Sequence, residues 1–246
     1  MSETATASSP QEDRRSVDPP PRPRVIAVDG SAASGKSSVG RLLAAHLGYP
    51  FLDTGVMYRA MTFAALDSAT DISDEAALGR LALSISITVT LNGTGTDRET
   101  NVAVNGRDVT SALRRSDVEE AVSLVSRVPV VRDALVSQQR KIAEKKAIVM
   151  AGRDIGTVVL PHADRKLYLD ASVDERAGRR HREFESLGRD VTHEEVLGDL
   201  RRRDQIDTER DVSPLRPAED AVIINTDGLS LEQVVARVIA IVESRS

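Results

Sequence analysis

Residues 30–37 read Gly30-Ser31-Ala32-Ala33-Ser34-Gly35-Lys36-Ser37, and this stretch fits the pattern G-x-x-x-x-G-K-[ST] without a gap. A short apolar, β-branched run at 24–29 precedes it and is typical of a buried strand. A helical pattern follows, whose apolar stripe stops at Gly48. In this setting the glycines let successive backbone N–H groups point at phosphate oxygens, and the helix adds its positive end. The stretch therefore predicts a phosphate-binding loop rather than a plain Gly/Ser turn.

The order of strand and then helix recurs along the chain. Further buried strands are predicted at 147–150, 166–169 and 221–225, and a helix at 229–242. Such alternation is typical of a parallel sheet covered by helices on both faces. We therefore expect an α/β fold of the P-loop NTPase type, occupying residues 24–246.

Three segments depart from this alternation of strand and helix. Residues 84–91 alternate in hydrophobicity and residues 102–107 contain the hairpin pair Asn105-Gly106, so a small β-containing insertion that binds substrate is expected at about 83–111. Residues 172–190 carry several arginines around Gly178 and Gly188 and are expected to form a helical lid, although a solvated charged helix fits them nearly as well. Residues 1–23 are rich in Ser, Thr, Pro and charge, which predicts a disordered tail.

Composition narrows the class of protein. The chain has 33 Lys+Arg against 38 Asp+Glu, a net charge of −5, and only 2% aromatic residues, so a nucleic-acid partner is not expected. It contains no cysteine, which excludes disulfides and cysteine metal clusters and suits a cytoplasmic location. No stretch approaches the roughly 20 apolar residues of a membrane span. We expect a monomer with small-molecule substrates.

A phosphate loop alone does not identify the reaction. The guanine-reading N-K-x-D and the D-x-x-G pattern of GTPases are missing from the sequence. The strands predicted at 147–150 and 166–169 do not end in the acidic pair that motor-type ATPases require. A kinase is therefore favoured over a GTPase or a motor.

Arginine lies beside carboxylate at three separate points. Arg153-Asp154 directly follows a buried strand, at the carboxyl edge where doubly wound sheets bind ligands, so a functional role is favoured there. The other two groups have plain structural alternatives, a helix cap with a surface charge and a solvated i,i+4 ion pair. Helical spacing would put the last group on one face of a helix, with a carboxylate between two guanidinium groups. These two groups are Asp53 with Arg59, and Arg203 with Asp207 and Arg210.

Three stretches together resemble the bacterial cytidylate kinases, over essentially the whole chain from residue 24 onward. They are Asp53-Thr54-Gly55-Val56-Met57-Tyr58-Arg59, Gly152-Arg153-Asp154-Ile155-Gly156-Thr157-Val158-Val159 and Arg203-Asp204-Gln205-Ile206-Asp207. Two departures are small: Ser31 stands where that family usually has Pro, and Val56 where it often has Ala. Because the loop works through its backbone N–H groups, Ser31 should be tolerated.

The resemblance implies ATP and Mg²⁺ as cofactors and CMP or dCMP as the acceptor. ATP would bind the loop, with Lys36 on the β and γ oxygens and the Ser37 hydroxyl on Mg²⁺. The ATP-binding residues are then Gly30, Ser31, Ala32, Ala33, Ser34, Gly35, Lys36, Ser37 and Ser38. The implied acceptor residues are Arg59, Arg153 and Arg210 around the phosphate with Thr54 nearby, Arg203 and Asp207 at the ribose, and Ser123, Arg132 and Asp154 at the base.

Residue chemistry supports this assignment. Cytosine offers an amino donor at N4 and acceptors at O2 and N3, so Asp154 can accept a hydrogen bond while Arg132 and Ser123 donate. Uracil presents O4 instead, and a carboxylate facing O4 would disfavour UMP. The acceptor phosphate has a second pKa near 6 and needs no protein base. Accordingly, no role is expected for His46, His162, His181 or His193.

Two rival functions remain open on the sequence. A kinase for a hydroxyl acceptor such as shikimate shares the fold but would want a carboxylate base. A nucleotide-gated protein whose arginine-rich segment contacts RNA would bind RNA with steep salt dependence and show no turnover.

Overall fold

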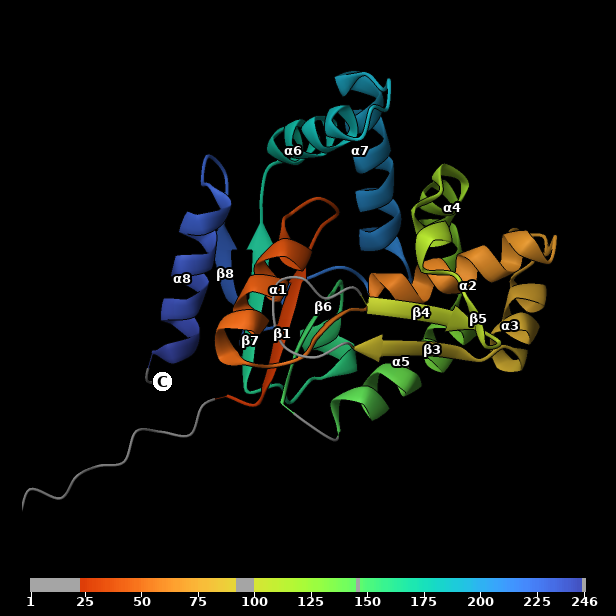
Figure 1. Cartoon of the computed structure of the whole chain (residues 1–246), viewed down its shortest axis with the longest axis horizontal. Helices are drawn as coiled ribbons and strands as arrows, with labels where there is room; N and C mark the ends of the chain where they lie inside the picture. The colour runs from red at the N-terminus through yellow and green to blue at the C-terminus, as the bar shows by residue number, and fades with distance from the viewer. Residues whose placement is uncertain (1–22, 92–99, 145–146, 245–246) are drawn as a thin grey trace, which may run out of the picture.

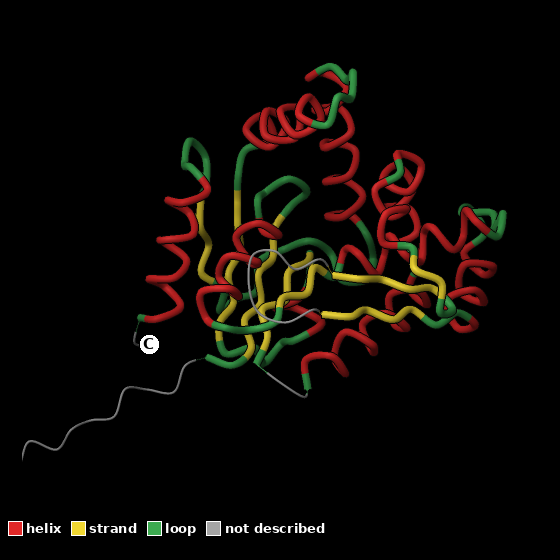
Figure 2. Tube along the Cα trace, viewed as in Figure 1, coloured by secondary structure: helices red, strands yellow, loops and turns green. Residues whose placement is uncertain are grey.

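The computed structural model describes residues 23–91, 100–144 and 147–244 of the 246-residue chain. Its centre is a five-stranded parallel sheet in the order β2-β6-β1-β7-β8 (Figures 1 and 2). The strands are β1 (Val25–Gly30), β2 (Phe51–Asp53), β6 (Ile148–Gly152), β7 (Arg165–Asp170) and β8 (Val222–Asn225). The predicted parallel sheet is confirmed, and the short strand β2 is one that the apolar pattern did not predict.

Helices cover both faces of this sheet, because its central strands are apolar on both sides. Ile26 and Val28 of β1 pack into one cluster with α1 (Lys36–Leu47) and α8 (Leu231–Glu243). Ala27, whose side chain points the other way, belongs to the core shared by α2 (Gly55–Asp67) and α5 (Pro129–Ala143). Continuous apolar runs of this kind are characteristic of buried parallel strands. The helix α1 ends at Gly48, whose φ of 72° gives the left-handed cap that the sequence predicted.

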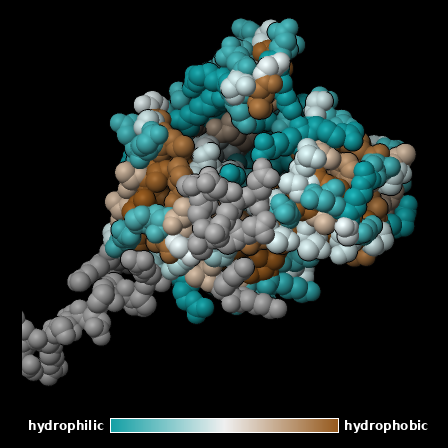
Figure 3. All heavy atoms as spheres, viewed as in Figure 1, coloured by the Kyte–Doolittle hydropathy of each residue, from teal (hydrophilic) through white to brown (hydrophobic). Residues whose placement is uncertain are grey.

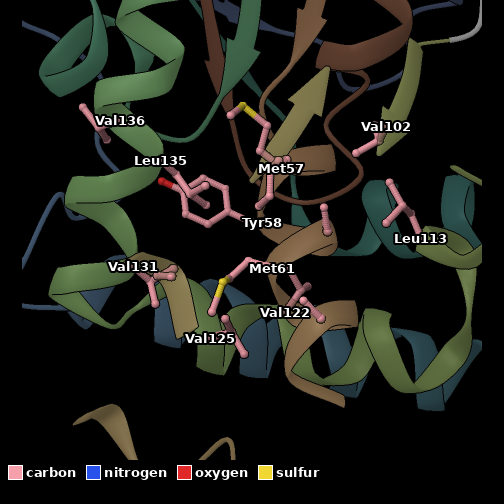
Figure 4. Packing of buried hydrophobic residues seen from close by; sticks show 14 of the residues in the cluster. Met57, Tyr58, Met61, Val102, Leu113, Val122, Val125, Val131, Leu135 and Val136 are labelled. Atoms are coloured by element: carbon pink, nitrogen blue, oxygen red, sulfur yellow. The ribbon is translucent and has the colours of Figure 1, made fainter. Parts of the chain in front are cut away.

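A second group of elements packs on the face of the sheet that carries Ala27, and most of it lies on the right in Figure 1. Its helices pack around a core of Met, Tyr, Val and Leu side chains, which Figure 4 shows from close by. Each fully buried aliphatic side chain there contributes roughly 1.5–3 kcal/mol to folding. The helices are α2 (Gly55–Asp67), α3 (Glu75–Ser84), α4 (Ser116–Ser126) and α5 (Pro129–Ala143), with a 3₁₀ turn at Thr110–Arg114.

This group includes a small antiparallel sheet, in the order β3-β4-β5, at the place where the β insertion was predicted. Its strands are β3 (Ile87–Leu91), β4 (Thr100–Val104) and β5 (Arg107–Asp108). Asn105 and Gly106 join β4 to β5 with φ values of 49° and 80°, as a tight hairpin turn requires. Part of the predicted insertion, residues 92–99, lies outside the described residues, as does almost all of the predicted tail.

The helices α6 (Val173–Ser186) and α7 (His193–Glu209) lie above the phosphate loop in Figure 1 and are mostly hydrophilic in Figure 3. They share a small apolar cluster in which Ala177, Val196 and Leu200 pack with Ala32 of the loop. The lid predicted at 172–190 thus consists of α6 and the turn after it, and its closure stays a prediction. None of the helices within the described ranges is long and apolar enough to cross a membrane.

Candidate functional site

The phosphate loop runs from the end of β1 to the start of α1 (Figure 1). Two of its residues must be glycine, for different reasons. A Cβ at Gly30 would lie 2.4 Å from the Leu169 carbonyl oxygen, and Gly35 has a φ of 87° directly before the helix. The α1 N-terminus has no side-chain cap, which leaves its first N–H groups available to an anion. The predicted geometry of a phosphate-binding loop is therefore present.

Lys36 is buried at the first position of α1. Its Nζ donates a hydrogen bond of 2.9 Å to the Ser31 carbonyl oxygen and so closes the loop on itself. Burial lowers the pKa of Lys36 well below its usual value, and the positive charge of Arg153 lowers it further. A buried ammonium group next to a guanidinium group favours a bound anion, because the anion would offset the repulsion between them.

Ser37 and Asp53 link the loop to the end of β2. The Ser37 hydroxyl donates to Asp53 Oδ2 at 2.6 Å, and Asp53 Oδ1 accepts from the Gly55 N–H at 2.9 Å. Burial alone would raise the pKa of Asp53, but the positive charges of Arg59 and Lys36 and the Ser37 hydrogen bond lower it overall. Asp53 is thus an ionised carboxylate beside the loop. The sequence paired it with Arg59 and missed Ser37.

Arg153 connects the loop with Asp207, one of the residues predicted to bind the acceptor. Its Nη1 donates to the Gly30 carbonyl oxygen at 3.4 Å, and its Nε donates to Asp207 Oδ2 at 2.8 Å. Although burial favours the neutral form, the negative charge of Asp207 raises the pKa of Arg153 overall. A permanently charged guanidinium group therefore lies between the phosphate loop and α7.

Asp154, the next residue, occupies a more deeply buried position with two arginines. It forms an ion pair with Nη2 of Arg132, and Arg210 Nη2 lies 3.9 Å from Asp154 Oδ1. The side chains of Asp154 and Arg132 are only 4% and 2% exposed. Arg132 also donates to the Ser126 carbonyl oxygen, one turn after Ser123 on α4. Ser123 is also buried. The three residues predicted at the base come from α4, from α5 and from the segment that follows β6.

Thr54 and Arg59 lie at the start of α2. The Thr54 hydroxyl donates to the Ala151 carbonyl oxygen at 3.0 Å, beside Gly152, where a Cβ would come within 2.7 Å of that hydroxyl. Arg59 is half-buried, and its charge acts on Asp53 and on Arg203. Thr54 and Arg59, both predicted near the acceptor phosphate, are thus brought to the edge of the sheet where β6 ends.

The helical spacing of Arg203, Asp207 and Arg210 predicted part of the pairing, since Arg210 lies within 3.9 Å of Asp207 and both arginines lower its pKa, but it missed the nearest partner. The helix α7 ends at Glu209, and Arg210 continues in extended conformation with a ψ of 139°. Arg153 is the near partner of Asp207, at 2.8 Å; Arg210 lies 3.9 Å away, and Arg203 lies 3.8 Å from Asp199 instead. The solvated ion pair is wrong, because Asp207 and Arg210 are buried.

Arg203 lies near two other arginines, Arg153 and Arg59, as well as near Asp199 and Asp207. Burial and the neighbouring Arg153 lower the pKa of Arg203 to about 10. Its Nε and Nη2 of Arg210 have no hydrogen-bond partner among the described residues. Buried donors of this kind cost free energy unless a ligand accepts from them. They indicate an anionic or polar ligand between α7 and the phosphate loop.

The lid arginines, which the sequence left without individual roles, have distinct partners. Arg176 is buried and donates to the Ala32 carbonyl oxygen of the phosphate loop at 3.1 Å and to Asp204 at 2.6 Å. Arg180 and Arg189 both donate to Glu119 of α4, at 2.8 and 3.1 Å. The start of α6 is therefore joined to the loop, and its later part and the turn after it to the helix that carries Ser123.

Sequence reasoning also gave no role to three buried polar residues near the site. Asp29 accepts hydrogen bonds from the Ile155 and Gly156 N–H groups. The Tyr58 ring lies 5.3 Å from the Arg132 guanidinium carbon, and Gln139 is fully buried on α5. The one signal for Asp29 was an acidic residue at the end of an otherwise apolar strand.

Comparison with known proteins agrees with this arrangement. The family model for cytidylate kinase matches residues 26–244. The cytidylate kinase of Herpetosiphon aurantiacus is 47% identical over 220 residues, covering 89% of this chain and 94% of that protein. Those of Carboxydothermus hydrogenoformans and Bacillus subtilis are 46% and 44% identical, over 88% and 90% of this chain and 96% and 97% of theirs. The chain belongs to the cytidylate kinase family.

Proposed function

We propose that this chain transfers the γ-phosphoryl group of ATP to CMP or dCMP, giving ADP and CDP or dCDP. The position of Arg153 carries the proposal. It reaches the first carbonyl of the phosphate loop with Nη1 and Asp207 with Nε, and the next residue, Asp154, faces Arg132 and Arg210. One short segment after β6 therefore joins a donor site to a pocket able to read a base.

The acceptor phosphate needs positive charge and correct placement more than it needs a general base from the protein. Its second pKa is near 6, so at neutral pH the attacking oxygen is already ionised. Arg59, Arg153 and Arg210 bind that phosphate, with Thr54 nearby, and Arg203 and Asp207 bind the ribose. Lys36 neutralises the charge that spreads over the transferring group. Holding two polyanions in line is then the main task of the protein.

Residues for a magnesium ion are present beside the loop. The Ser37 hydroxyl and the Asp53 carboxylate lie 2.6 Å apart, and oxygen donors of this kind suit Mg²⁺, which usually binds one or two protein groups and the substrate phosphates. The depressed pKa of Asp53 keeps that carboxylate ionised. When bound, the ion neutralises phosphate charge and orients the triphosphate.

Base selection rests on Asp154, Arg132 and Ser123. Asp154 accepts from the cytosine amino group, while Arg132 and Ser123 donate to the ring acceptors. Arg132 Nε is buried and has no hydrogen-bond partner among the described residues, so a base that reached it would find an unused donor. UMP would place a carbonyl oxygen against the Asp154 carboxylate and is disfavoured.

An ADP-release assay over CMP, dCMP, UMP, AMP and shikimate tests the proposal. We expect the highest kcat/KM for CMP or dCMP, and no ADP release above the ATP-hydrolysis background with shikimate. Activity on shikimate alone would identify a kinase for a hydroxyl acceptor. Tight, steeply salt-dependent RNA binding without turnover would identify the RNA-binding alternative. Either outcome removes the proposal.

A further inference from the structure

Asp154 begins a short helical turn that it does not cap. It lies at the N-cap of the single π-helical turn Ile155–Val159, yet its side chain makes no cap hydrogen bond. An aspartate at this position usually accepts from the N–H groups of the first turn. Here the carboxylate turns to Arg132 and Arg210 instead. The N–H groups of the turn must therefore be satisfied by another residue.

Asp29 supplies that cap from a different strand. It is the second-last residue of β1, and its Oδ1 accepts from the Ile155 N–H at 2.8 Å while Oδ2 accepts from the Gly156 N–H at 2.7 Å. Both carboxylate oxygens are thus used, and the residue is only 3% exposed. An asparagine of the same shape could accept only one of these hydrogen bonds.

We infer that Asp29 is a positioning residue, which caps the turn after β6 in place of Asp154 and thereby leaves the Asp154 carboxylate free to recognise cytosine. The inference rests on the proposed function, in which Asp154 reads the base. Without Asp29, two buried N–H groups would lack an acceptor, and the adjacent Asp154 is the nearest carboxylate in sequence that could rotate to cap them. Base selection would then weaken although Asp154 is still present.

The surroundings of Asp29 disfavour the ionised form of its carboxylate. Burial, together with the nearby negative charge of Asp154, raises the pKa of Asp29 to about 6, although the two backbone hydrogen bonds and Lys36 oppose the rise. Tyr168 on the adjacent strand β7 faces the same region, and Lys166 packs against Gly156. A neutral residue at position 29 would avoid this cost. We therefore attribute the presence of a carboxylate at this position to its ability to accept two hydrogen bonds.

The test compares Asp29→Asn with a matched variant, Asp164→Asn. Asp164 Oδ2 also accepts from two backbone N–H groups, those of Arg24 and Val25, at 2.7 and 2.8 Å, but at the opposite end of β1. We expect Asp29→Asn to lower the ratio of kcat/KM for CMP to that for UMP about tenfold, the discrimination of roughly one good base contact. Asp164→Asn should leave that ratio unchanged. The Kd for ATP alone, measured by calorimetry, should stay within about twofold in both variants.

A double-mutant cycle separates positioning from general loosening of the fold. If Asp29 acts through Asp154, Asp29→Asn should change the CMP-to-UMP ratio little in an Asp154→Ala background. The wild-type enzyme offers a measurement that needs no variant: the ratio should fall as the pH drops from 8 to below about 6, when Asp29 takes up a proton. CMP and UMP share the same phosphate pKa, so this ratio cancels the titration of the substrate phosphate.

An unchanged ratio in Asp29→Asn, whatever happens to the Tm, would overturn the inference, and so would an equal fall in Asp164→Asn. Should Asp29→Asn not fold, a CMP-to-UMP ratio that stays flat in wild type between pH 8 and pH 5.5 overturns it instead. The proposed function fails separately, if the wild-type enzyme does not prefer CMP over UMP at pH 8.

Discussion

The two halves of the site are built in opposite ways. The phosphate loop is eight consecutive residues whose shape depends on Gly30 and Gly35, and its binding groups are mainly backbone N–H groups. The proposed acceptor half consists of side chains from separate elements, namely Thr54 after β2, Arg59 on α2, Ser123 on α4, Arg132 on α5, Arg153 and Asp154 after β6, and Arg203, Asp207 and Arg210 in or just after α7. We therefore expect the loop to tolerate changes of side chain outside its glycines, Lys36 and Ser37, and the acceptor half to lose separate functions one residue at a time.

Lys36→Ala should have the largest effect, because Lys36 is the one side chain of the loop with a charge. We expect kcat to fall on the order of 10³-fold, as when a main electrostatic group is removed from a phosphoryl-transfer site. Steady-state ADP release with CMP at saturating ATP measures it. The stability of the fold should not fall, because burial lowers the pKa of Lys36 and the removed charge is a costly one.

A Lys36→Ala enzyme that keeps more than about a tenth of the wild-type kcat would contradict this view of the loop. Lys36→Arg is the control, since it keeps the charge in a bulkier, planar form.

Arg153→Ala should come next, with a fall in kcat of about 10²-fold. It also removes the near partner of Asp207, at 2.8 Å, and leaves a buried carboxylate less well paired. Unlike Lys36→Ala, this variant should therefore unfold at a lower temperature than wild type, which differential scanning calorimetry measures. An unchanged Tm would show that Arg210 alone can satisfy Asp207.

Asp154→Ala should have a smaller and more selective effect. We expect the CMP-to-UMP ratio of kcat/KM to fall roughly tenfold or more, while the Kd for ATP stays near the wild-type value. The substitution also leaves Arg132 buried without its ion-pair partner, so a lower Tm is expected. The ADP-release assay with CMP and UMP, run on wild type and variant side by side, measures this ratio. If both acceptors lose activity equally, Asp154 does not read the base.

The same contrast explains what the sequence could predict. The loop, the main strands and the helix ending at Gly48 were predictable, because each depends on a local pattern of glycine or of apolar residues. The predicted Arg59 and Arg210 do act on Asp53 and Asp207, but the nearest partners of these carboxylates were not predictable, because sequence neighbours and helical spacing describe only local contacts. Asp207 pairs with Arg153, 54 residues away, and Asp53 pairs with Ser37, 16 residues away. Contacts of this range depend on strand order, which no local pattern encodes.

Ser31→Pro should have the smallest effect and tests the loop most directly. The Ser31 carbonyl oxygen accepts from Lys36 Nζ and from the Ser34 N–H, and proline keeps that carbonyl. The substitution removes the Ser31 N–H and also the Ser31 hydroxyl, whose hydrogen bond to Tyr168 opposes the rise in the pKa of that phenol. We expect kcat and the KM for ATP to stay within about twofold of wild type, because the remaining N–H groups still face the phosphates. A loss of tenfold or more would mean that the Ser31 N–H itself binds phosphate, and the loop would then depend on a residue that its sequence pattern leaves free.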